Sequence, residues 1–352
     1  MNRITWLDTS RGLAIVLLIL VHYVGALETR GFISYEAMNL VKAFLRVATP
    51  YFIMIFGFTF AVAYKTKINS FRDVLVILKR LRKNLLLVFI AREIIAVTAV
   101  FRYGNYKTDL VDVLLYKNFS QSGEILTFYF FAILLAPLAM LLINKVKSSI
   151  FLFSAFSLYI ISYTIGYNFS SSDNGLLFRF LFFDVYAFFP FFSLAMVSMY
   201  LYTLYSSLNS DYQRVKTFLL IGSTLFIISL ILLFGLYEDV VVALATAKLK
   251  SPPQILYMVL YSGEAILLTI FVCVLKYKNL LPIINNRLLP LLGRNSLLAY
   301  VGHYFLFLAG PIAFIVLDER TAIGELIIFL SLVTLLITVI TTRDNFKTKG
   351  LK

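Results

Sequence analysis

The chain has 352 residues, of which 61% are hydrophobic and only 14% are charged, and its mean hydropathy is +0.88. A soluble domain needs a charged shell around its core, so this composition excludes an ordinary soluble enzyme, a disordered protein and a coiled coil. The formal net charge is +14. Its basic residues separate apolar runs, as in the cytoplasmic loops of membrane proteins, and we therefore expect an all-α integral membrane protein that binds no nucleic acid.

Apolar runs of the length that a bilayer requires follow one another along the chain and predict about ten transmembrane helices. Since no internal repeat and no soluble appendage is visible, residues 1–352 are expected to form a single domain. The sixth run contains Pro190 and predicts one long helix that is kinked or tilted. The runs are Gly12–Leu27, Phe44–Tyr64, Leu85–Phe101, Ile125–Ile143, Ser149–Tyr167, Leu176–Tyr205, Thr217–Leu236, Ile255–Leu275, Leu297–Val316 and Ile323–Ile340.

Basic and acidic loops alternate between these runs. Basic residues gather at 65–83, 145–147, 214–216 and 276–294 and in the tail, whereas the intervening loops carry more acid. The positive-inside rule then places both termini in the cytoplasm, which requires an even number of spans and agrees with ten. No cleavable signal peptide is recognisable, and we expect a multi-pass protein of the cell membrane. The acidic residues are Asp109, Asp112, Asp173, Glu238, Asp239, Asp318 and Glu319.

Metal and cofactor sites are not expected. The chain has one cysteine, Cys273, and two histidines, too few for a zinc or iron–sulfur site of the usual composition. No glycine-rich phosphate loop is present either. We therefore expect no metal and no permanently bound cofactor.

Ionisable residues in the first run and just before it are the sharpest functional candidates, because such residues are costly in lipid. Arg11 and His22 are eleven residues apart, which places them on one helix face about 16 Å apart, and Asp8 lies one turn before Arg11. A slender ligand with an anionic end at Arg11 and a reactive end at His22 would fit. The alternative is a snorkelling Arg11 capped by Asp8 and a His22 that is hydrogen-bonded between helices.

Several segments resemble the acyltransferase 3 family, whose relatives include glucan succinyltransferases and heparan alpha-glucosaminide N-acetyltransferases. That family opens with a helix bearing an Arg, ten residues and a His, as in LDTSRGLAIVLLILVH at 7–22. Phe56 stands where the family commonly has a Ser before Gly57. Further similar segments, in the family's order over nearly the whole chain, are TPYFIMIFGF at 49–58, KRLR at 79–82, KSPPQILY at 250–257 and LGRNSLLAYVGH at 292–303.

The resemblance implies transfer of an acyl group, often acetyl from acetyl-CoA, to a hydroxyl or amine of a carbohydrate or lipid-linked glycan, as in the O-acetylation of polysaccharides. His22, expected deep in the membrane at a buried site, would act as the general base, and an acyl-histidine intermediate is the less favoured route. Arg11, Lys79 and Arg82 would hold the anionic end of the donor near the cytoplasmic face, and Arg92 is placed to reach the same cavity. The alternative for the basic segment is simple topology and contact with lipid headgroups.

Other polar residues complete the expected site. Asp8 and Glu264 join His22 in the predicted catalytic set, with Glu264 orienting the imidazole or binding acceptor hydroxyls. Arg92 and its neighbour Glu93 point about 100° apart and are not expected to pair, whereas Arg179 and Asp184 are expected to cap or tie spans near the outer face. Acceptor-binding or structural roles are expected for His303, Tyr257, Asn295 and Ser296.

Three readings of these residues compete. The preferred one is a membrane acyltransferase that takes its acyl group from a cytoplasmic acyl-CoA, with a carbohydrate or lipid-linked glycan and membrane lipids as its other partners. A transporter or flippase would line its path with the same charges, but such folds often carry inverted repeats. A structural membrane subunit would leave Arg11 and His22 without a purpose. The sequence leaves open the acceptor, the acyl chain and whether the protein forms a homodimer.

Overall fold

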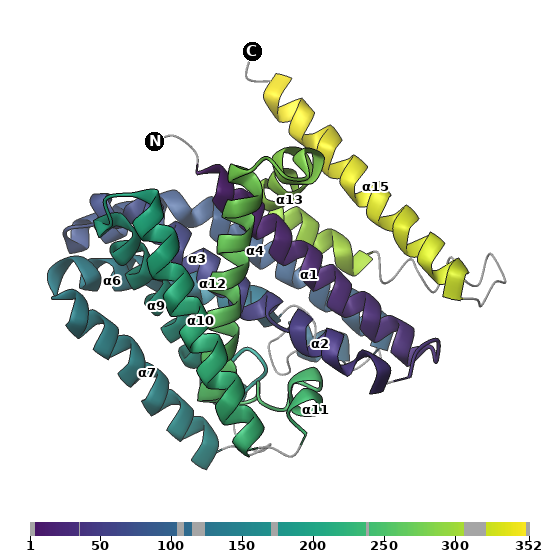
Figure 1. Cartoon of the computed structure of the whole chain (residues 1–352), viewed down its shortest axis with the longest axis horizontal. Helices are drawn as coiled ribbons and strands as arrows, with labels where there is room; N and C mark the ends of the chain where they lie inside the picture. Colours follow the sequence, from purple (N-terminus) through teal and green to yellow (C-terminus); the bar gives the residue numbers. More distant parts are fainter. Residues whose placement is uncertain are drawn as a thin grey trace. The chain divides into compact units, whose positions relative to one another are not determined.

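The computed structural model describes residues 4–34, 36–103, 109–114, 124–169, 175–236, 239–305 and 322–349. Nearly all of these residues are helical, and no β-strand occurs among them (Figure 1). Eight helical segments within the described ranges are long and apolar enough to cross a membrane. The predicted all-α polytopic fold is thus confirmed, while the number ten and the cytoplasmic termini stay predictions.

The described chain divides into two compact units. Unit 1 comprises Met1–Phe52, Phe234–Thr246 and Glu264–Lys352, and unit 2 comprises Ile53–Leu233 and Ala247–Gly263. Two helices, α3 (Ala48–Tyr64) and α12 (Ile255–Tyr277), contribute residues to both. The single domain over residues 1–352 stays a prediction.

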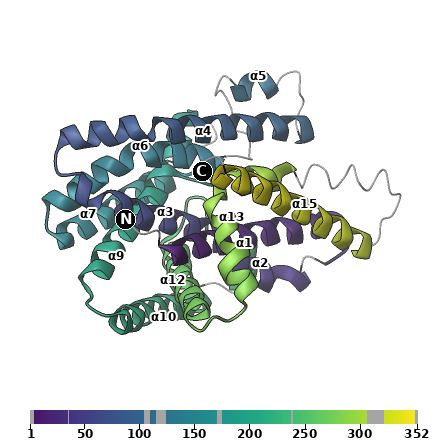
Figure 2. The ribbon, with the colours of Figure 1, turned by 90° about the horizontal axis from the view of Figure 1, so that it is seen from above.

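Unit 1 is built around the first helix, α1 (Thr5–Thr29), which packs against α2, η3, α13 and α15. A further helical stretch at 296–305 follows α13 directly. Figure 2 shows α1 between α2 and α13. The other elements of this unit are η1 (Glu36–Met38), α2 (Asn39–Leu45), α11 (Val240–Ala245), η3 (Ile284–Leu288), α13 (Leu289–Arg294) and α15 (Ala322–Lys349).

Glycines allow α1 and α13 to pack backbone against backbone. A Cβ atom at Gly12 would lie 2.0 Å from the carbonyl oxygen of Leu289, and one at Gly293 would lie 1.8 Å from the carbonyl oxygen of Asp8. Both distances are far inside van der Waals contact, so only glycine fits at either position. Small residues are the usual means of close helix approach in membranes, where apolar burial supplies no driving force between helices.

Unit 2 is a helical layer in which α4 packs against α5 and α6, and α9 packs against α6, α7 and α8. Figure 2 shows α4 and α6 side by side. A glycine again permits close approach, since a Cβ atom at Gly57 would lie 2.2 Å from the carbonyl oxygen of Ala195. The elements of this unit are η2 (Lys65–Lys67), α4 (Phe71–Tyr103), α5 (Asp109–Leu114), α6 (Glu124–Lys145), α7 (Ser148–Asn168), α8 (Leu176–Phe182), α9 (Phe188–Ser207) and most of α10 (Asp211–Leu236).

The long helix α4 contains the third predicted span and extends well beyond it. Its 33 residues correspond to about 50 Å, whereas the apolar part of a bilayer is about 30 Å thick. The helix begins with a capping box, in which the Ser70 hydroxyl accepts from the Asp73 N–H and the Asp73 carboxylate accepts from the Ser70 N–H at 2.9 Å. The ninth predicted span, Leu297–Val316, is described only as far as residue 305.

The prediction of one kinked helix over Leu176–Tyr205 was wrong. The structure has two helices there, α8 and α9, separated by residues 183–187. Pro190 is the third residue of α9, within the first turn, where its missing N–H removes no intrahelical hydrogen bond. The proline therefore marks the beginning of a helix rather than a bend within one.

Candidate functional site

The two histidines of the chain lie side by side in unit 1. Their ring centroids are 5.3 Å apart, with an angle of 34° between the ring planes. His22 comes from α1, and His303 comes from the helical stretch at 296–305. The ring of Tyr304 lies 4.4 Å from that of His303 and 6.2 Å from that of His22. The sequence suggested each histidine separately and gave no sign that they would meet.

Asn295 connects α13 to the helix that carries His303. Its N–H donates to the carbonyl of Leu291, its own carbonyl accepts from the N–H of Ala299, and its side-chain amide donates to Leu291 and to Asp344. Helix α13 packs closely on α1 at Gly12 and Gly293. The hydrogen bonds of Asn295 join α13 to the following helix, so the position of that helix also depends on the contact with α1. These hydrogen bonds are compatible with the structural role expected for Asn295. Ser296 is the first residue of the helix that follows.

The His303 ring is held by the backbone. Its Nδ1 donates a hydrogen bond to the carbonyl oxygen of Tyr300, and because a carbonyl can only accept, the neutral ring must carry its proton on Nδ1 and its lone pair on Nε2. The Tyr300 and Tyr304 hydroxyls lie 3.4 Å apart beside it. His303 is fully buried, so its ring has a defined tautomer in a dry environment.

His22 itself is exposed, and the prediction of a buried imidazole was wrong. The buried residues of α1 are densest between Leu7 and Ile19, and after His22 only Val24 and Leu27 are buried in this helix. The histidine pair thus has one imidazole that is accessible to a ligand and one that is enclosed by protein.

Charged residues gather where α1 begins. Asp8 is buried and lies 3.8 Å from Arg11, whose side chain is 28% exposed. Arg294, which follows Gly293 at the contact with Asp8, forms an ion pair with Asp344 at 3.0 Å. The predicted contact of Asp8 with Arg11 is therefore present, and Arg11 remains partly accessible.

Comparison with protein families identifies the chain. A family model described as an acyltransferase domain, that of the acyltransferase 3 family, matches residues 4–343. The chain belongs to the acyltransferase 3 family. No curated protein and no solved structure matches it. The protein is therefore a multi-pass membrane acyltransferase, and the transporter and structural-subunit readings are set aside.

In this acyltransferase Glu264 has no described link to the histidines. The side chain is buried, at 6% exposure. Among the residues that the structure describes, its Oε1 atom has no hydrogen-bond partner, and no ion pair joins its carboxylate to His22 or His303. The group that orients the His303 ring is the Tyr300 carbonyl. An orienting role for Glu264 stays a prediction.

The four residues predicted to bind the donor fall into two classes. Lys79 and Arg82 are exposed on α4, and Arg11 is half-exposed on α1. Arg92, by contrast, is buried at 3% exposure, and its Nη1 lies 3.0 Å from the Glu93 carboxylate. The prediction that Arg92 and Glu93 would not pair was wrong, because the long arginine side chain bends around the helix although the two Cα–Cβ bonds diverge.

The remaining candidates lie elsewhere. Tyr257 is fully buried in the part of α12 that belongs to unit 2, and its ring is 4.7 Å from that of Tyr261 in an edge-to-face arrangement. Arg179 and Asp184 form an ion pair between α8 and the residues that follow it, with Nη2 and Oδ1 3.2 Å apart, while their place near the outer face stays a prediction. Sequence reasoning assigned no role to Glu124 or to Lys250, which is 5% exposed although it is charged. The only signal for Lys250 was its place before two prolines.

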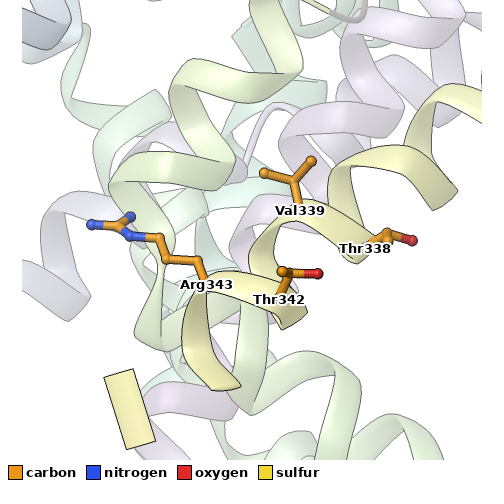
Figure 3. Close-up of a pocket in the computed structure, with 4 residues that line it drawn as sticks. All are labelled: Thr338, Val339, Thr342 and Arg343. Carbon is orange, nitrogen blue, oxygen red and sulfur yellow. The ribbon is translucent and has the colours of Figure 1, made fainter. Parts of the chain in front are cut away.

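Neither a metal site nor a shallow pocket on α15 adds to the histidine site. Among the described residues no group of three or more His, Cys, Asp or Glu side chains is placed to hold a metal ion. A shallow pocket of about 390 Å³ is lined by Thr338, Val339, Thr342 and Arg343, all from α15 (Figure 3). In Figure 3 the Arg343 guanidinium and the two threonine hydroxyls point to opposite sides. Their polar groups do not converge, so we assign this pocket no role.

Proposed function

We propose that this membrane acyltransferase moves an acyl group, acetyl in the simplest case, from a cytoplasmic acyl-CoA to a hydroxyl or amine of a cell-surface or lipid-linked carbohydrate. The membrane in question is the cell membrane. The observation that supports this proposal most directly is the histidine pair. An accessible imidazole beside a buried imidazole of fixed tautomer suits the removal of a proton from a neutral nucleophile.

In the proposed reaction His22 is the general base. One of its ring nitrogens takes the proton of the acceptor hydroxyl as the oxygen attacks the carbonyl carbon of the thioester. The C–S bond then breaks, the acyl group stays on the acceptor oxygen, and the departing sulfur receives the proton from the His22 imidazolium. Atoms and charge balance without a metal or a redox partner.

His303 would orient His22 in this scheme. With 5.3 Å between the ring centroids, two imidazole nitrogens can approach to about 3 Å when the rings turn toward each other, which is a normal hydrogen-bond length. The Nε2 of His303 would then accept an N–H from His22 and leave the other His22 nitrogen with its lone pair toward the acceptor. His303 is a positioning residue here, because it touches neither substrate.

Three basic side chains are proposed to bind the phosphates of the donor: Arg11, Lys79 and Arg82. Each is at least partly exposed, and arginine suits phosphate because its planar fork donates two parallel hydrogen bonds. Contact with anionic lipid headgroups uses the same chemistry and is the alternative for the residues of α4. Arg92 is a weaker candidate than the other three, because Glu93 already neutralises its charge.

The experiment that tests this function uses the purified protein in nanodiscs with radiolabelled acetyl-CoA and octyl β-D-glucoside as a hydroxyl-bearing probe. Wild type should transfer label to the sugar, and His22→Ala should reduce the rate by about 10²–10⁴, the usual contribution of a general base. Leu20→Ala, an exposed position on the same helix, is the matched control and should retain the rate.

Two outcomes would contradict the proposed mechanism. Equal rates for His22→Ala and wild type would remove His22 from the chemistry. Label that appears on the protein in the absence of acceptor, is missing from His22→Ala and then moves to the sugar would establish an acyl-histidine instead of direct transfer.

A further inference from the structure

Unit 2 contains a group of charged side chains that the proposed mechanism does not use. Glu124, the first residue of α6, lies within electrostatic range of Arg92, Arg179, Asp184 and Lys250. These residues come from four separate parts of the chain and meet inside one unit. We call the group, with the two side chains that contact it directly, the α6 cluster: Arg92, Glu93, Glu124, Arg179, Asp184, Tyr186 and Lys250.

Most charges of the α6 cluster are already matched. Arg92 pairs with Glu93 at 3.0 Å, and Arg179 pairs with Asp184 at 3.2 Å. Fully ionised, the cluster holds three cations and three carboxylates and therefore has no net charge. A site built for the phosphates of a nucleotide would carry excess positive charge, so the composition of this cluster favours a neutral polar ligand.

Glu124 is the carboxylate that is left for a ligand. Among the described residues, no hydrogen bond and no ion pair within 4.0 Å holds it. The side chain is half-buried, so a bound molecule can reach it.

Lys250 is held in the cluster by a tightly folded loop. Its N–H donates to the Ala247 carbonyl, and it forms a β-bridge with Pro253, whose carbonyl accepts from the Tyr159 hydroxyl at 2.8 Å. The ammonium group lies 3.9 Å from the centroid of the Tyr186 ring. The buried cation is thus positioned by backbone contacts from both sides rather than left to find its own place.

We propose that the α6 cluster is the site that recognises the acceptor and that its ligand is a neutral carbohydrate. A sugar hydroxyl both donates and accepts, so it needs carboxylate and cationic groups close together in a site without net charge. Glu124 accepts from one hydroxyl, while Lys250 and Arg179 donate to neighbouring hydroxyl oxygens. Charged groups enclosed in a membrane protein are costly, and binding of a sugar would explain why they are present here.

The proposed location agrees with the predicted topology. Helix α6 ends at Lys145, in a loop predicted to be cytoplasmic, so Glu124 at its beginning lies toward the outer side, where a cell-surface acceptor is found. This assignment rests on the proposed function for the class of acceptor. It concerns a different set of residues from the histidine pair, and the two can therefore fail separately.

The test is photolabelling of the full-length protein in nanodiscs with a diazirine derivative of octyl β-D-glucoside, in the absence of acyl donor, followed by mass spectrometry. We expect label on peptides that contain residues 124–131, 179–188 or 247–257. Glu124→Gln and Lys250→Met should each lower that label about tenfold or more, as expected for loss of a hydrogen bond to a charged group.

Matched controls are available in the chain. Lys248→Met removes an exposed lysine from the same loop, and Glu36→Gln removes an exposed glutamate elsewhere; both should label as wild type does. Acetyl-CoA binding should be unchanged in all four variants. If Lys250→Met fails to fold, Lys250→Arg keeps the charge and should retain at least part of the label.

The outcomes separate the two proposals. Labelling outside the α6 cluster, no labelling, or equal labelling of Lys250→Met and Lys248→Met would overturn the acceptor site. Should His22-dependent transfer to octyl glucoside persist in those cases, the proposed function would stand and only the site would be wrong. Cluster labelling that depends on Glu124, in a protein without transfer activity, would support the sugar site and overturn the function.

Discussion

The histidine pair of unit 1 and the α6 cluster of unit 2 hold their polar groups in opposite ways. His303 is fixed by a backbone carbonyl, on a helix that is positioned by direct backbone contact between α1 and α13. In the α6 cluster two arginines and two carboxylates are held by pairing with each other, Arg92 with Glu93 and Arg179 with Asp184. A proton transfer needs one ring orientation and one tautomer, which a backbone can impose. Recognition of a hydroxyl-rich ligand needs several donors and acceptors, which paired charges supply.

The substitution with the largest expected effect on the histidine pair is one that forces α1 and α13 apart. In Gly12→Ala the new Cβ would lie 2.0 Å from the Leu289 carbonyl oxygen, and a backbone atom cannot move aside as a flexible side chain can. We expect a loss of stability of at least about 1–3 kcal/mol, as for other overpacked interiors, together with loss of transfer activity. Thermal unfolding and turnover in nanodiscs would measure both.

Gly25→Ala is the control for that substitution. Gly25 lies on the same helix and has nothing within 4 Å of the Cβ position, so alanine there should be neutral, or stabilising by up to about 1 kcal/mol because it favours the helix. If Gly12→Ala were as stable and as active as Gly25→Ala, the backbone contact would not position the histidine pair.

The next largest effect concerns the His303 ring. His303→Asn keeps a donor near the position of Nδ1 but removes Nε2, and we expect kcat to fall about 10–100-fold, as when other orienting groups are lost, while KM for acetyl-CoA stays the same. His303→Gln places an amide near Nε2 and should retain more activity than His303→Asn. A purely structural role would give both variants the same loss, or a change in KM as well.

The sequence predicted the fold class better than the relation between distant residues. Long apolar runs define spans because each helix must satisfy its own backbone in lipid, and this logic holds for α1, α6, α7, α10 and α12. Hydropathy predicted one helix over residues 176–205, whereas the structure has two and Pro190 lies in the first turn of the second. A short break between two apolar helices does not change the mean hydropathy enough to be detected.

The site was predictable only in part. His22, Arg11 and Asp8 share one helix, so their relation followed from helical geometry and from the family resemblance. The meeting of His22 with His303 depends on how α13 packs on α1, which sequence spacing does not determine. The pairing of Arg92 with Glu93 depends on side-chain conformation, which the direction of the Cβ atoms alone misjudged.

A double-mutant cycle on Arg179 and Asp184 would test whether charge pairing holds the α6 cluster of unit 2. The ion pair is 3.2 Å long, but the arginine side chain is 35% exposed, so solvent screens it and the coupling energy should not exceed about 1 kcal/mol at low salt. Arg179→Met, Asp184→Asn and the double variant would be unfolded in 0.05–0.5 M salt, roughly the range over which screening changes strongly. Coupling that does not fall with salt would show that the α6 cluster is not held by charge.

The smallest expected effect comes from a carboxylate of unit 2 that the backbone holds. Hydrogen bonds from the Asn69 N–H and from Ser70 lower the pKa of Asp73 below its ordinary value, whereas burial outweighs Arg179 and raises the pKa of Asp184. A lowered pKa means that the ionised Asp73 stabilises the start of α4 above its ordinary pKa, and that this contribution disappears as the pH falls through the lowered value. Amide hydrogen exchange of residues 70–74 should therefore accelerate, relative to the middle of α4, as the pH falls from about 4, the ordinary pKa of aspartate, through the lowered value. Asp73→Asn should remove this pH dependence, because the amide does not ionise.

Salt should have little effect on the pH dependence at Asp73, because the partners of its carboxylate are mainly backbone N–H groups and a hydroxyl. The coupling energy of the Arg179–Asp184 pair, by contrast, should fall with salt. A salt dependence as strong as that of the ion pair would contradict the distinction between groups held by the backbone and groups held by charge.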